Sequence, residues 1–422
     1  MTTSSARPVL DRPLSRRLFL RGSALIGCSA AAFPWMTSVT LAAAPFDERL
    51  VVIILRGAMD GIDVVRPVGD PNYAGLRSAD MTGTAAPLPL DGFYALHPAL
   101  AELMPMWKAG ELAFAHAVST PYRDKRSHFD GQDILEAGTG LDVPDTRIKD
   151  GWLNRMLQAV PAMSAQTAYA VGRDEMKVIE GKADVMSWAP DTRLQLSEQS
   201  RTLLEAVYHD DPLFRDASAE AMDIVDRLKA EQAADGGGTG SMTGGMANGM
   251  MAGKKARPGS GAQLAAFTAA RLREETRIAA FSISGWDTHR AQHGVLANRL
   301  TDLAATLRTL RAGLGPVWDK TTVLAMTEFG RTARENGTRG TDHGTGGAMI
   351  MAGGALRGGK VYGTWPGLTE ADLFERRDLM PTADVRSYAA WAMRGLYGFD
   401  KHLLETTVFP GLDMGGDPKI IA

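Results

Sequence analysis

The stretch T-T-V-L-A-M-T-E-F-G-R-T-A-R-E-N-G-T-R-G-T-D-H-G, residues 321–344, decides how this chain folds. Its first six residues form a short, largely apolar run, which is typical of a strand buried on both faces of a parallel sheet. The rest is a polar, glycine-rich loop that carries Glu328, Arg331, Asp342 and His343. Because α/β proteins place ligands beyond the carboxyl ends of their strands, the stretch predicts a functional loop at one edge of a parallel sheet.

Further short apolar runs occur on both sides of this stretch, at 50–55, 112–118, 278–283 and 348–352. Between and beyond them lie stretches with the periodicity of amphipathic helices, at 98–108, 128–137, 196–208, 213–231, 262–275, 294–313 and 384–397. This alternation predicts an α/β fold with a mostly parallel central sheet.

Composition and charge narrow the class of protein. The chain is 45% hydrophobic and 23% charged, as expected for a globular protein. Its net charge is −3, and loss of residues 1–44, which hold five Arg and one Asp, would make it −7. This balance argues against a nucleic acid partner. After residue 44 no apolar run reaches the roughly 18 residues of a membrane span.

The N-terminal 44 residues have the order of an export signal. Ser15-Arg16-Arg17-Leu18-Phe19-Leu20 fits the twin-arginine pattern, and an apolar stretch then leads to a small-residue cleavage site at Ala42-Ala43-Ala44. The alternative is a basic tail with a chance Arg pair. Leu25-Ile26-Gly27-Cys28 also resembles a lipobox, but the apolar run before Cys28 is short, so ordinary cleavage ranks above a lipid anchor. We therefore expect a periplasmic or secreted protein that is recognised and exported by the twin-arginine machinery.

Residues 45–422 are expected to form a single domain. A Gly- and Met-rich segment at 234–261 is too rich in glycine to bury a core, and both its flanks look helical. We interpret it as a flexible insert within the domain. Cys28 is the only cysteine, which excludes disulfides within the chain and clusters of thiolate ligands.

Three other expected strands also lead into polar loops. Asp60 follows the run at 50–55, Ser127 and His128 follow that at 112–118, and Asp287 and His289 follow that at 278–283. In a parallel sheet these loops share an edge with Asp342 and His343. Oxygen and imidazole ligands of this kind suit Zn²⁺, Mn²⁺ or Mg²⁺, and several carboxylates in one cleft would repel each other without a cation.

Each candidate residue also has a structural interpretation. Asp60, Asp342 and His343 could stabilise glycine-flanked turns, and His289 could donate to a backbone carbonyl. Ser127 could cap a helix or act there as a nucleophile, with His128 as its proton shuttle. Arg331 could pair with Glu328 or clamp an anionic ester oxygen.

In combination, several motifs resemble the DUF1501 family of exported bacterial proteins. They are R-G-A-M-D-G, R-S-H-F-D-G-Q-D, G-W-D-T-H, T-E-F-G-R-T, E-N-G, G-T-D-H-G-T-G-G and G-G-K-V-Y-G-T-W-P-G-L, and they span nearly all of the chain after residue 44. The family looks like a branch of the alkaline phosphatase and sulfatase superfamily. The resemblance implies a three-layer α/β/α sandwich with metal ligands and a nucleophile at the carboxyl edge of its sheet.

The resemblance also suggests roles for single residues. Asp60, Asp342 and His343 match one set of metal ligands, Asp287 matches the aspartate of a second metal site, and Ser127 stands where the nucleophile would be. Position 291 is Ala where a ligand histidine is usual, and His289 and His293 are spaced differently. Ligands for one metal are therefore better matched than ligands for two.

Two functions follow as hypotheses. The first is an exported hydrolase of phosphate or sulfate esters, which would take a small anionic ester as substrate and a divalent metal (Zn, Mn, Mg or Ca) as cofactor. Ser127, His128 and Arg331 would be its catalytic residues, and Asp60, Asp287, His289, Asp342 and His343 its metal ligands. The second is a non-catalytic binding or assembly protein with the same fold, which the Ala at position 291 favours.

Overall fold

A computed structural model describes residues 46–123, 126–140, 150–160, 165–190 and 261–422. They belong to one compact unit, Ala44–Ala422. The expected export signal, the expected helices at 196–208 and 213–231, and the expected insert at 234–260 lie outside the described residues. Gly261, expected at the end of that insert, begins a helix instead.

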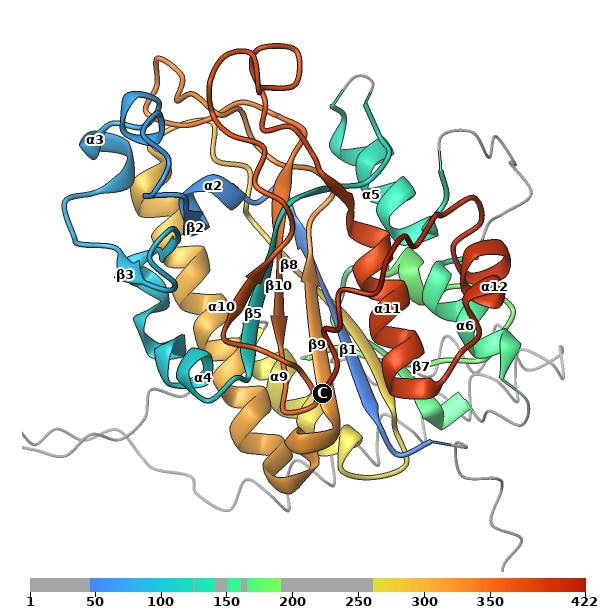
Figure 1. The fold of residues 1–422 in the computed structure, drawn as a ribbon. Coiled ribbons are helices and arrows are strands. Elements are labelled where there is room, and N and C mark those ends of the chain that lie inside the picture. Colours follow the sequence, from blue (N-terminus) through green and yellow to red (C-terminus); the bar gives the residue numbers. More distant parts are fainter. Residues whose placement is uncertain (1–45, 124–125, 141–149, 161–164, 191–260) are drawn as a thin grey trace, which may run out of the picture. The chain divides into compact units, whose positions relative to one another are not determined.

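A mixed sheet of nine strands forms the centre of the described structure (Figure 1). Its order is β11-β5-β10-β9-β1-β8-β6-β7, and β12 pairs with β5. The strands are β1 Arg49–Arg56, β5 Leu112–Ser119, β6 Ala168–Val171, β7 Met186–Trp188, β8 Ile278–Ser284, β9 Thr321–Met326, β10 Gly347–Ala352, β11 Lys360–Tyr362 and β12 Ala383–Asp384. A smaller sheet holds β2 Val65–Arg66, β3 Leu88–Pro89 and β4 Ala95–Leu96.

The five strands expected from apolar runs are β1, β5, β8, β9 and β10, and the expectation of a mostly parallel sheet is confirmed. β1 is parallel to both β8 and β9. β10 is the exception, since it runs antiparallel to β9 on one side and to β5 on the other. The reversal leaves β5 pointing the same way as β9, so β1, β5, β8 and β9 all end at one edge of the sheet.

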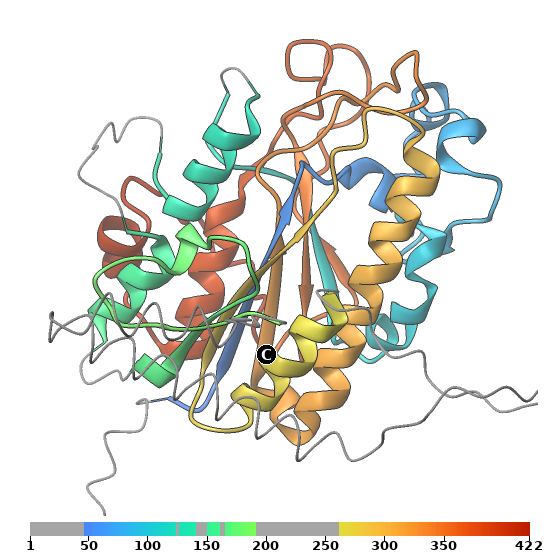
Figure 2. The same ribbon diagram turned by 180° about the vertical axis from the view of Figure 1, so that it is seen from behind.

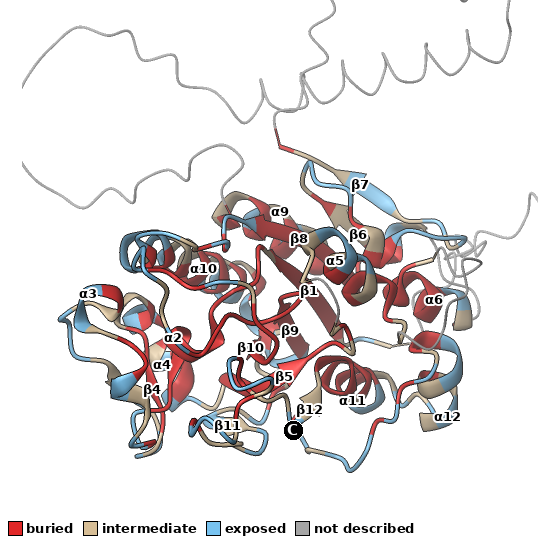
Figure 3. Ribbon diagram, turned by 90° about the horizontal axis from the view of Figure 1, so that it is seen from above, coloured by how far each residue is buried: buried red, intermediate tan, exposed pale blue. Residues whose placement is uncertain are grey.

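The side chains of β1 divide between two hydrophobic cores, one on each face of the sheet. Val51 and Ile53 pack in the core covered by α9 and α10, whereas Leu50 and Val52 pack in the core covered by α6 and α11. This alternation follows from the two-residue period of a strand. Figure 2 shows α9 and α10 side by side on one face, and Figure 3 shows β1 and β9 buried between the helical layers. The predicted three-layer α/β/α sandwich is confirmed.

Most of the described helices follow the predicted amphipathic stretches. The helices are α2 Gly61–Val64, α3 Ala79–Thr82, α4 Met104–Lys108, α5 His128–Ala137, α6 Trp152–Ala159, α9 Gly261–Leu272, α10 Gln292–Leu314, α11 Val385–Tyr397 and α12 Lys401–Leu403. The stretch expected at 98–108 is split into a 3-10 helix, Pro98–Leu103, and α4. Its two prolines, Pro98 and Pro105, lie in the first turns of these helices, where the missing N–H is tolerated. Within the described ranges, no helix combines the length and apolar character needed to cross a membrane.

Candidate metal centre

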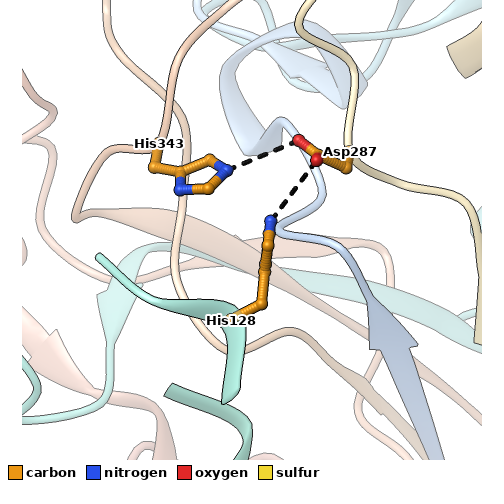
Figure 4. A group of neighbouring side chains, drawn as sticks. All are labelled: His128, Asp287 and His343. Atoms are coloured by element: carbon orange, nitrogen blue, oxygen red, sulfur yellow. Dashed lines mark ion pairs between the residues drawn. The ribbon is translucent and has the colours of Figure 1, made fainter. Parts of the chain in front are cut away.

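Three residues that follow different strands meet at the shared carboxyl edge of the sheet. His128 begins α5 after β5, Asp287 follows β8, and His343 lies in the loop between β9 and β10. Each offers one ligand atom, and these atoms all lie within 4.8 Å of one another (Figure 4). The strand order therefore brings together residues more than 200 positions apart in the sequence.

The start of α5 points His128 into this group. Ser127 is the N-cap of the helix, with extended backbone, and its Oγ accepts a hydrogen bond from Asp130 N at 3.4 Å. The backbone N–H of Ser127 donates to the Tyr122 hydroxyl at 3.1 Å. Arg126, directly before the cap, has a φ of 52°. This left-handed residue turns the chain sharply, so that His128 becomes the first residue of the helix.

The His128 ring is bound on one side only. Its Nδ1 lies 2.8 Å from Glu328 Oε1, and because a carboxylate only accepts, Nδ1 carries the proton of the neutral ring. Its Nε2 is buried and has no hydrogen-bond partner among the described residues. Asp287 Oδ2 lies 3.5 Å from it. His128 therefore aims a nitrogen lone pair into the group.

His343 repeats this arrangement, and His289 lies beside it. His343 Nδ1 is 2.7 Å from the Arg126 carbonyl oxygen, and His289 Nδ1 is 3.0 Å from Asp342 Oδ1. The Arg126 carbonyl lacks a proton, so the neutral His343 ring carries its proton at Nδ1. Both nitrogens of His289 face carboxylate oxygens, because its Nε2 lies 3.1 Å from Asp287 Oδ1, so Asp342 alone does not decide which nitrogen of this ring carries the proton. The Nε2 atoms of His343 and His289 lie only 3.0 Å apart. Two lone pairs at this distance repel each other unless a proton or a metal cation binds them.

Asp287 supplies the negative charge of the group, and Arg331 holds it in place. Arg331 NH1 lies 2.7 Å from Asp287 Oδ1, and His289 Nε2 lies 3.1 Å from the same oxygen. The Arg331 side chain is fully buried and also binds Thr341. Burial raises the pKa of the Asp287 carboxyl, but the hydrogen bond and charge of Arg331 outweigh it and hold that pKa below its usual value.

The pKa values of His128 and His343 are shifted in opposite directions. The hydrogen bond with Glu328 raises the pKa of His128 against the effect of burial. Burial lowers the pKa of His343. Burial also raises the pKa of Glu328, yet hydrogen bonds from His128 and other donors bring it below its usual value. The site thus keeps two ionised carboxyl groups, Asp287 and Glu328, on either side of the imidazoles.

The donor set fits a divalent metal. Imidazole nitrogens and carboxylate oxygens are the ligands that zinc takes from proteins other than thiolates. Metal-binding histidines usually donate their second ring N–H to a carboxylate or backbone carbonyl, as His128 and His343 do here. The buried, unpartnered Nε2 of His128 is the atom that a metal would satisfy.

Other residues predicted as ligands lie outside this group of three. Asp60 is buried, caps α2 and binds Arg77 at 2.6 Å and Gln292 at 2.7 Å, so both its oxygens are engaged within the protein. Asp342 is 54% exposed and orients His289. Their roles as metal ligands, like that of His289, stay predictions. Arg77 compensates the charge of Asp60, although that charge, after burial, still helps to raise the pKa of the neighbouring Asp63.

Two features of the site were not anticipated. The pairing of Glu328 with Arg331 was wrong: among the described residues, Arg331 pairs with Asp287 and Glu328 pairs with His128. His128, expected as a proton shuttle, also stands among the possible ligand residues. Two signals were available: the place of His128 beside Ser127 at a helix start, and the place of Glu328 two residues after the end of β9. Neither pattern alone indicates that the two side chains meet.

Fold and site together define a three-layer α/β protein with a candidate metal centre of histidine and aspartate at the carboxyl edge of its sheet. A family model described as "Protein of unknown function (DUF1501)" matches residues 113–390. The match covers more than half of the chain, and the chain belongs to this family. His128, Asp287 and His343 lie inside the matched range, whereas Asp60 lies before it. No curated protein shows a significant match to the chain.

Two solved structures share only a distant likeness. A protein in the alkaline phosphatase superfamily from Vibrio parahaemolyticus aligns with 79% of this chain and 69% of its own, at 11% identity and a TM-score of 0.33. The C-terminal periplasmic domain of EcEptC from Escherichia coli, in complex with Zn, aligns with 74% of this chain and 76% of its own, at 9% identity and a TM-score of 0.31. Likeness at this level does not bear on the function of the chain.

Proposed function

We propose that this chain is a metal-dependent hydrolase of phosphate or sulfate esters. One observation carries the proposal: His128 Nε2, His343 Nε2 and an Asp287 oxygen converge, with the second nitrogen of each ring already bound to an acceptor. Such a cluster has the composition of a catalytic zinc site, in which three protein ligands leave a position open.

His128, Asp287 and His343 would hold the metal. Arg331 occupies Asp287 Oδ1, so Oδ2, the oxygen nearer to His128, is the one available to a cation. His289 lies beside this set and is the candidate for a further ligand. Two imidazoles and one carboxylate favour zinc over Mg²⁺ or Ca²⁺, which prefer oxygen ligands. When bound, the metal would polarise the ester and stabilise its developing negative charge.

Ser127 is the proposed nucleophile. It immediately precedes His128, and the single hydrogen bond that its Oγ accepts is long, at 3.4 Å. Attack by Oγ on phosphorus or sulfur would form a covalent ester and break the bond to the leaving alcohol oxygen, while the proton lost by the hydroxyl passes through water to that oxygen. Water would then hydrolyse the covalent ester and restore the serine. Arg331 is buried against Asp287, which supports a role in orienting that ligand rather than in direct contact with substrate.

Aryl phosphates and sulfates, assayed with zinc-loaded protein, test this mechanism. We expect Ser127→Ala to abolish turnover while zinc content stays unchanged. Ser78→Ala is the matched control, because Ser78 also precedes a helix, α3, but lies outside the group of ligand atoms. Full activity of Ser127→Ala would rule out the serine mechanism, and absence of turnover in zinc-loaded wild-type protein would rule out the hydrolase.

A non-catalytic binding or assembly role is the second candidate. Two observations favour it: position 291 is Ala, and Arg331 already compensates the charge of Asp287. A proton on one of the two facing Nε2 atoms would then be donated to the other, which removes their repulsion without a metal. Elemental analysis distinguishes the two candidates, because less than about half an equivalent of any divalent metal would favour the second.

We further propose that the protein is exported by the twin-arginine pathway and acts in the periplasm or outside the cell. Arg16-Arg17, the following apolar stretch and Ala42-Ala43-Ala44 support this proposal. Replacing both arginines with lysine should retain the protein in the cytoplasm, as cell fractionation would show. Unchanged export of this variant would contradict the assignment.

A further inference from the structure

We propose that Glu328 is the positioning residue of the metal centre and presents His128 to the cation by holding its ring in the Nδ1–H tautomer. The proposal rests on the proposed metal centre and extends it to a residue that does not itself touch the metal. Glu328 is the second residue after β9, directly behind the group of ligands, and its side chain is fully buried.

Hydrogen-bond donors surround the Glu328 carboxylate. Oε1 accepts from Gly57 N at 2.9 Å, from Gln132 Nε2 at 3.1 Å and from His128 Nδ1 at 2.8 Å. Oε2 accepts from Thr327 Oγ1 at 2.9 Å. Three elements contribute these donors: the end of β1, helix α5 and the loop after β9. The carboxylate is therefore fixed before any metal binds.

No lysine or arginine in the described part of the chain pairs with Glu328, and its sole ionic partner there is His128. A buried carboxylate without a cation is costly, because desolvation removes the water that stabilised its charge. Through the His128 ring, this charge attracts positive charge to the opposite nitrogen, Nε2. That nitrogen is buried and faces Asp287, so a cation bound there would lie between two carboxylates.

Packing fixes the plane of the His128 ring, and the hydrogen bond with Glu328 fixes which edge faces the ligands. Its plane stacks on the Phe329 ring, with centroids 5.3 Å apart and an interplanar angle of 20°. Rotation that turned Nε2 toward Glu328 would carry Nδ1 away from its acceptor. Phe329 follows Glu328 in the sequence, so the same turn supplies both the acceptor and the stacking surface.

Glu328 differs from the acceptors of the other two imidazoles. His343 donates to a backbone carbonyl, and His289 Nδ1 faces Asp342, which is 54% exposed. Solvent screens the charge of Asp342, whereas the charge of Glu328 is buried. Among the three, Glu328 is the acceptor whose replacement would most strongly change the charge felt by the metal.

The test compares Glu328→Gln with Glu136→Gln in the full-length protein. The amide that replaces the Glu328 carboxylate keeps an oxygen that can accept the same three hydrogen bonds, so the change removes the charge and preserves the shape. Glu136 is the matched control: it is equally buried, lies on α5 and pairs with Arg56 at 2.7 Å, but does not contact the histidines. Zinc affinity is measured by competition with a chromophoric chelator, and the melting temperature confirms that each variant is folded.

We expect Glu328→Gln to weaken zinc binding about 10- to 100-fold, the usual effect of removing such a partner, and Glu136→Gln to leave it unchanged. Equal zinc affinity of wild type and Glu328→Gln would overturn the proposal. Nitrogen-15 NMR of the metal-free wild type gives a separate result: a proton on His128 Nδ1 supports the proposal, and one on Nε2 overturns it. If the wild type bound no zinc, the proposed function would fail. The NMR result would still show whether Glu328 holds the His128 ring in the Nδ1–H tautomer.

Discussion

At the scale of single residues, polar side chains at the strand ends form two kinds of environment. Asp60 is compensated inside the protein: Arg77 lies 2.6 Å from its carboxylate and also donates to two backbone carbonyls, of Ala333 and Thr332. The nitrogens of His128 and His343 instead face one another and Asp287. The ion pair of Asp60 and Arg77 holds loops together. The group of His128, His343 and Asp287 is the place where a bound ligand would accept the ring nitrogens' lone pairs.

Arg77→Ala tests the first environment. The change leaves a buried, uncompensated Asp60 and should lower the free energy of unfolding by about 3–5 kcal/mol. Arg376→Ala is the control, because its pair with Glu370 is exposed on both sides and should be worth no more than about 1 kcal/mol. Denaturant unfolding monitored by circular dichroism measures both. A loss for Arg77→Ala as small as that of the control would show that the ion pair is not structural.

The sequence indicated which loops carry the site better than it indicated what each residue contacts. Asp287, His343 and His128 were all identified, because polar residues that follow apolar runs in a parallel sheet share an edge. The buried partner of Asp60 could not be foreseen: Arg77 lies in a loop between α2 and α3 with no periodic pattern. For the same reason a pair between Glu328 and the nearby Arg331 was considered, whereas one between Glu328 and His128 was not.

At the scale of elements, the loop between β9 and β10 doubles back on itself to place His343. Gly330 N donates to Thr345 O at 3.0 Å, and Gly344 N donates to Gly330 O at 2.8 Å. The two arms approach so closely that a Cβ on Gly330 would lie 1.8 Å from Gly346 O. Glycine is required here by close backbone approach, and the glycines that mark this loop in the sequence have that cause.

Gly330→Ala should therefore displace the arm that carries His343. We expect zinc affinity to fall by about tenfold or more, since small shifts of a ligand or its support have effects of this size. Gly337→Ala is a control in the same loop, because nothing lies within 4 Å of a Cβ at that position. Wild-type zinc affinity in Gly330→Ala would show that the loop adjusts without moving His343.

Strands and helices were predictable where their burial leaves a clear apolar pattern in the sequence. β1, β5, β8 and β9 are buried on both faces, and α5 begins at His128 as expected. The direction of β10 was not predictable, because a continuous apolar run is the same for parallel and antiparallel pairing. β6 and β7 were missed because four and three residues are too few to show a clear period, and α6 was missed although six of its eight residues are buried.

At the scale of the whole molecule, two buried histidines link stability to pH. Burial lowers the pKa of His97 to about 3 and that of His116 to about 4. His116 Nδ1 accepts a hydrogen bond from Ala117 N at 2.9 Å, and its Nε2 donates to Val65 O at 2.9 Å. Protonation of Nδ1 would abolish the first bond. Both rings are therefore neutral in the folded protein, whereas an unfolded histidine takes up a proton below pH 6.5 or so.

Stability should be highest above about pH 6.5 and fall as the pH drops toward 4, because the unfolded chain then binds more protons than the folded one. Each histidine contributes a slope of roughly 1.4 kcal/mol per pH unit in this window. His116→Gln should reduce the slope of unfolding free energy against pH, and His402→Gln, an exposed control, should not. Equal slopes for wild type and His116→Gln would contradict the assignment of a neutral buried ring.

The central claim is that His128, Asp287 and His343 bind one divalent metal, and direct measurement of zinc stoichiometry tests it best. Full-length protein, depleted of metal and titrated with zinc in a calorimeter, should bind one equivalent. The double variant His128→Ala/His343→Ala should lose this binding, and His402→Ala should keep it. Absence of zinc binding by folded wild-type protein, or one equivalent still bound by the double variant, would contradict the account.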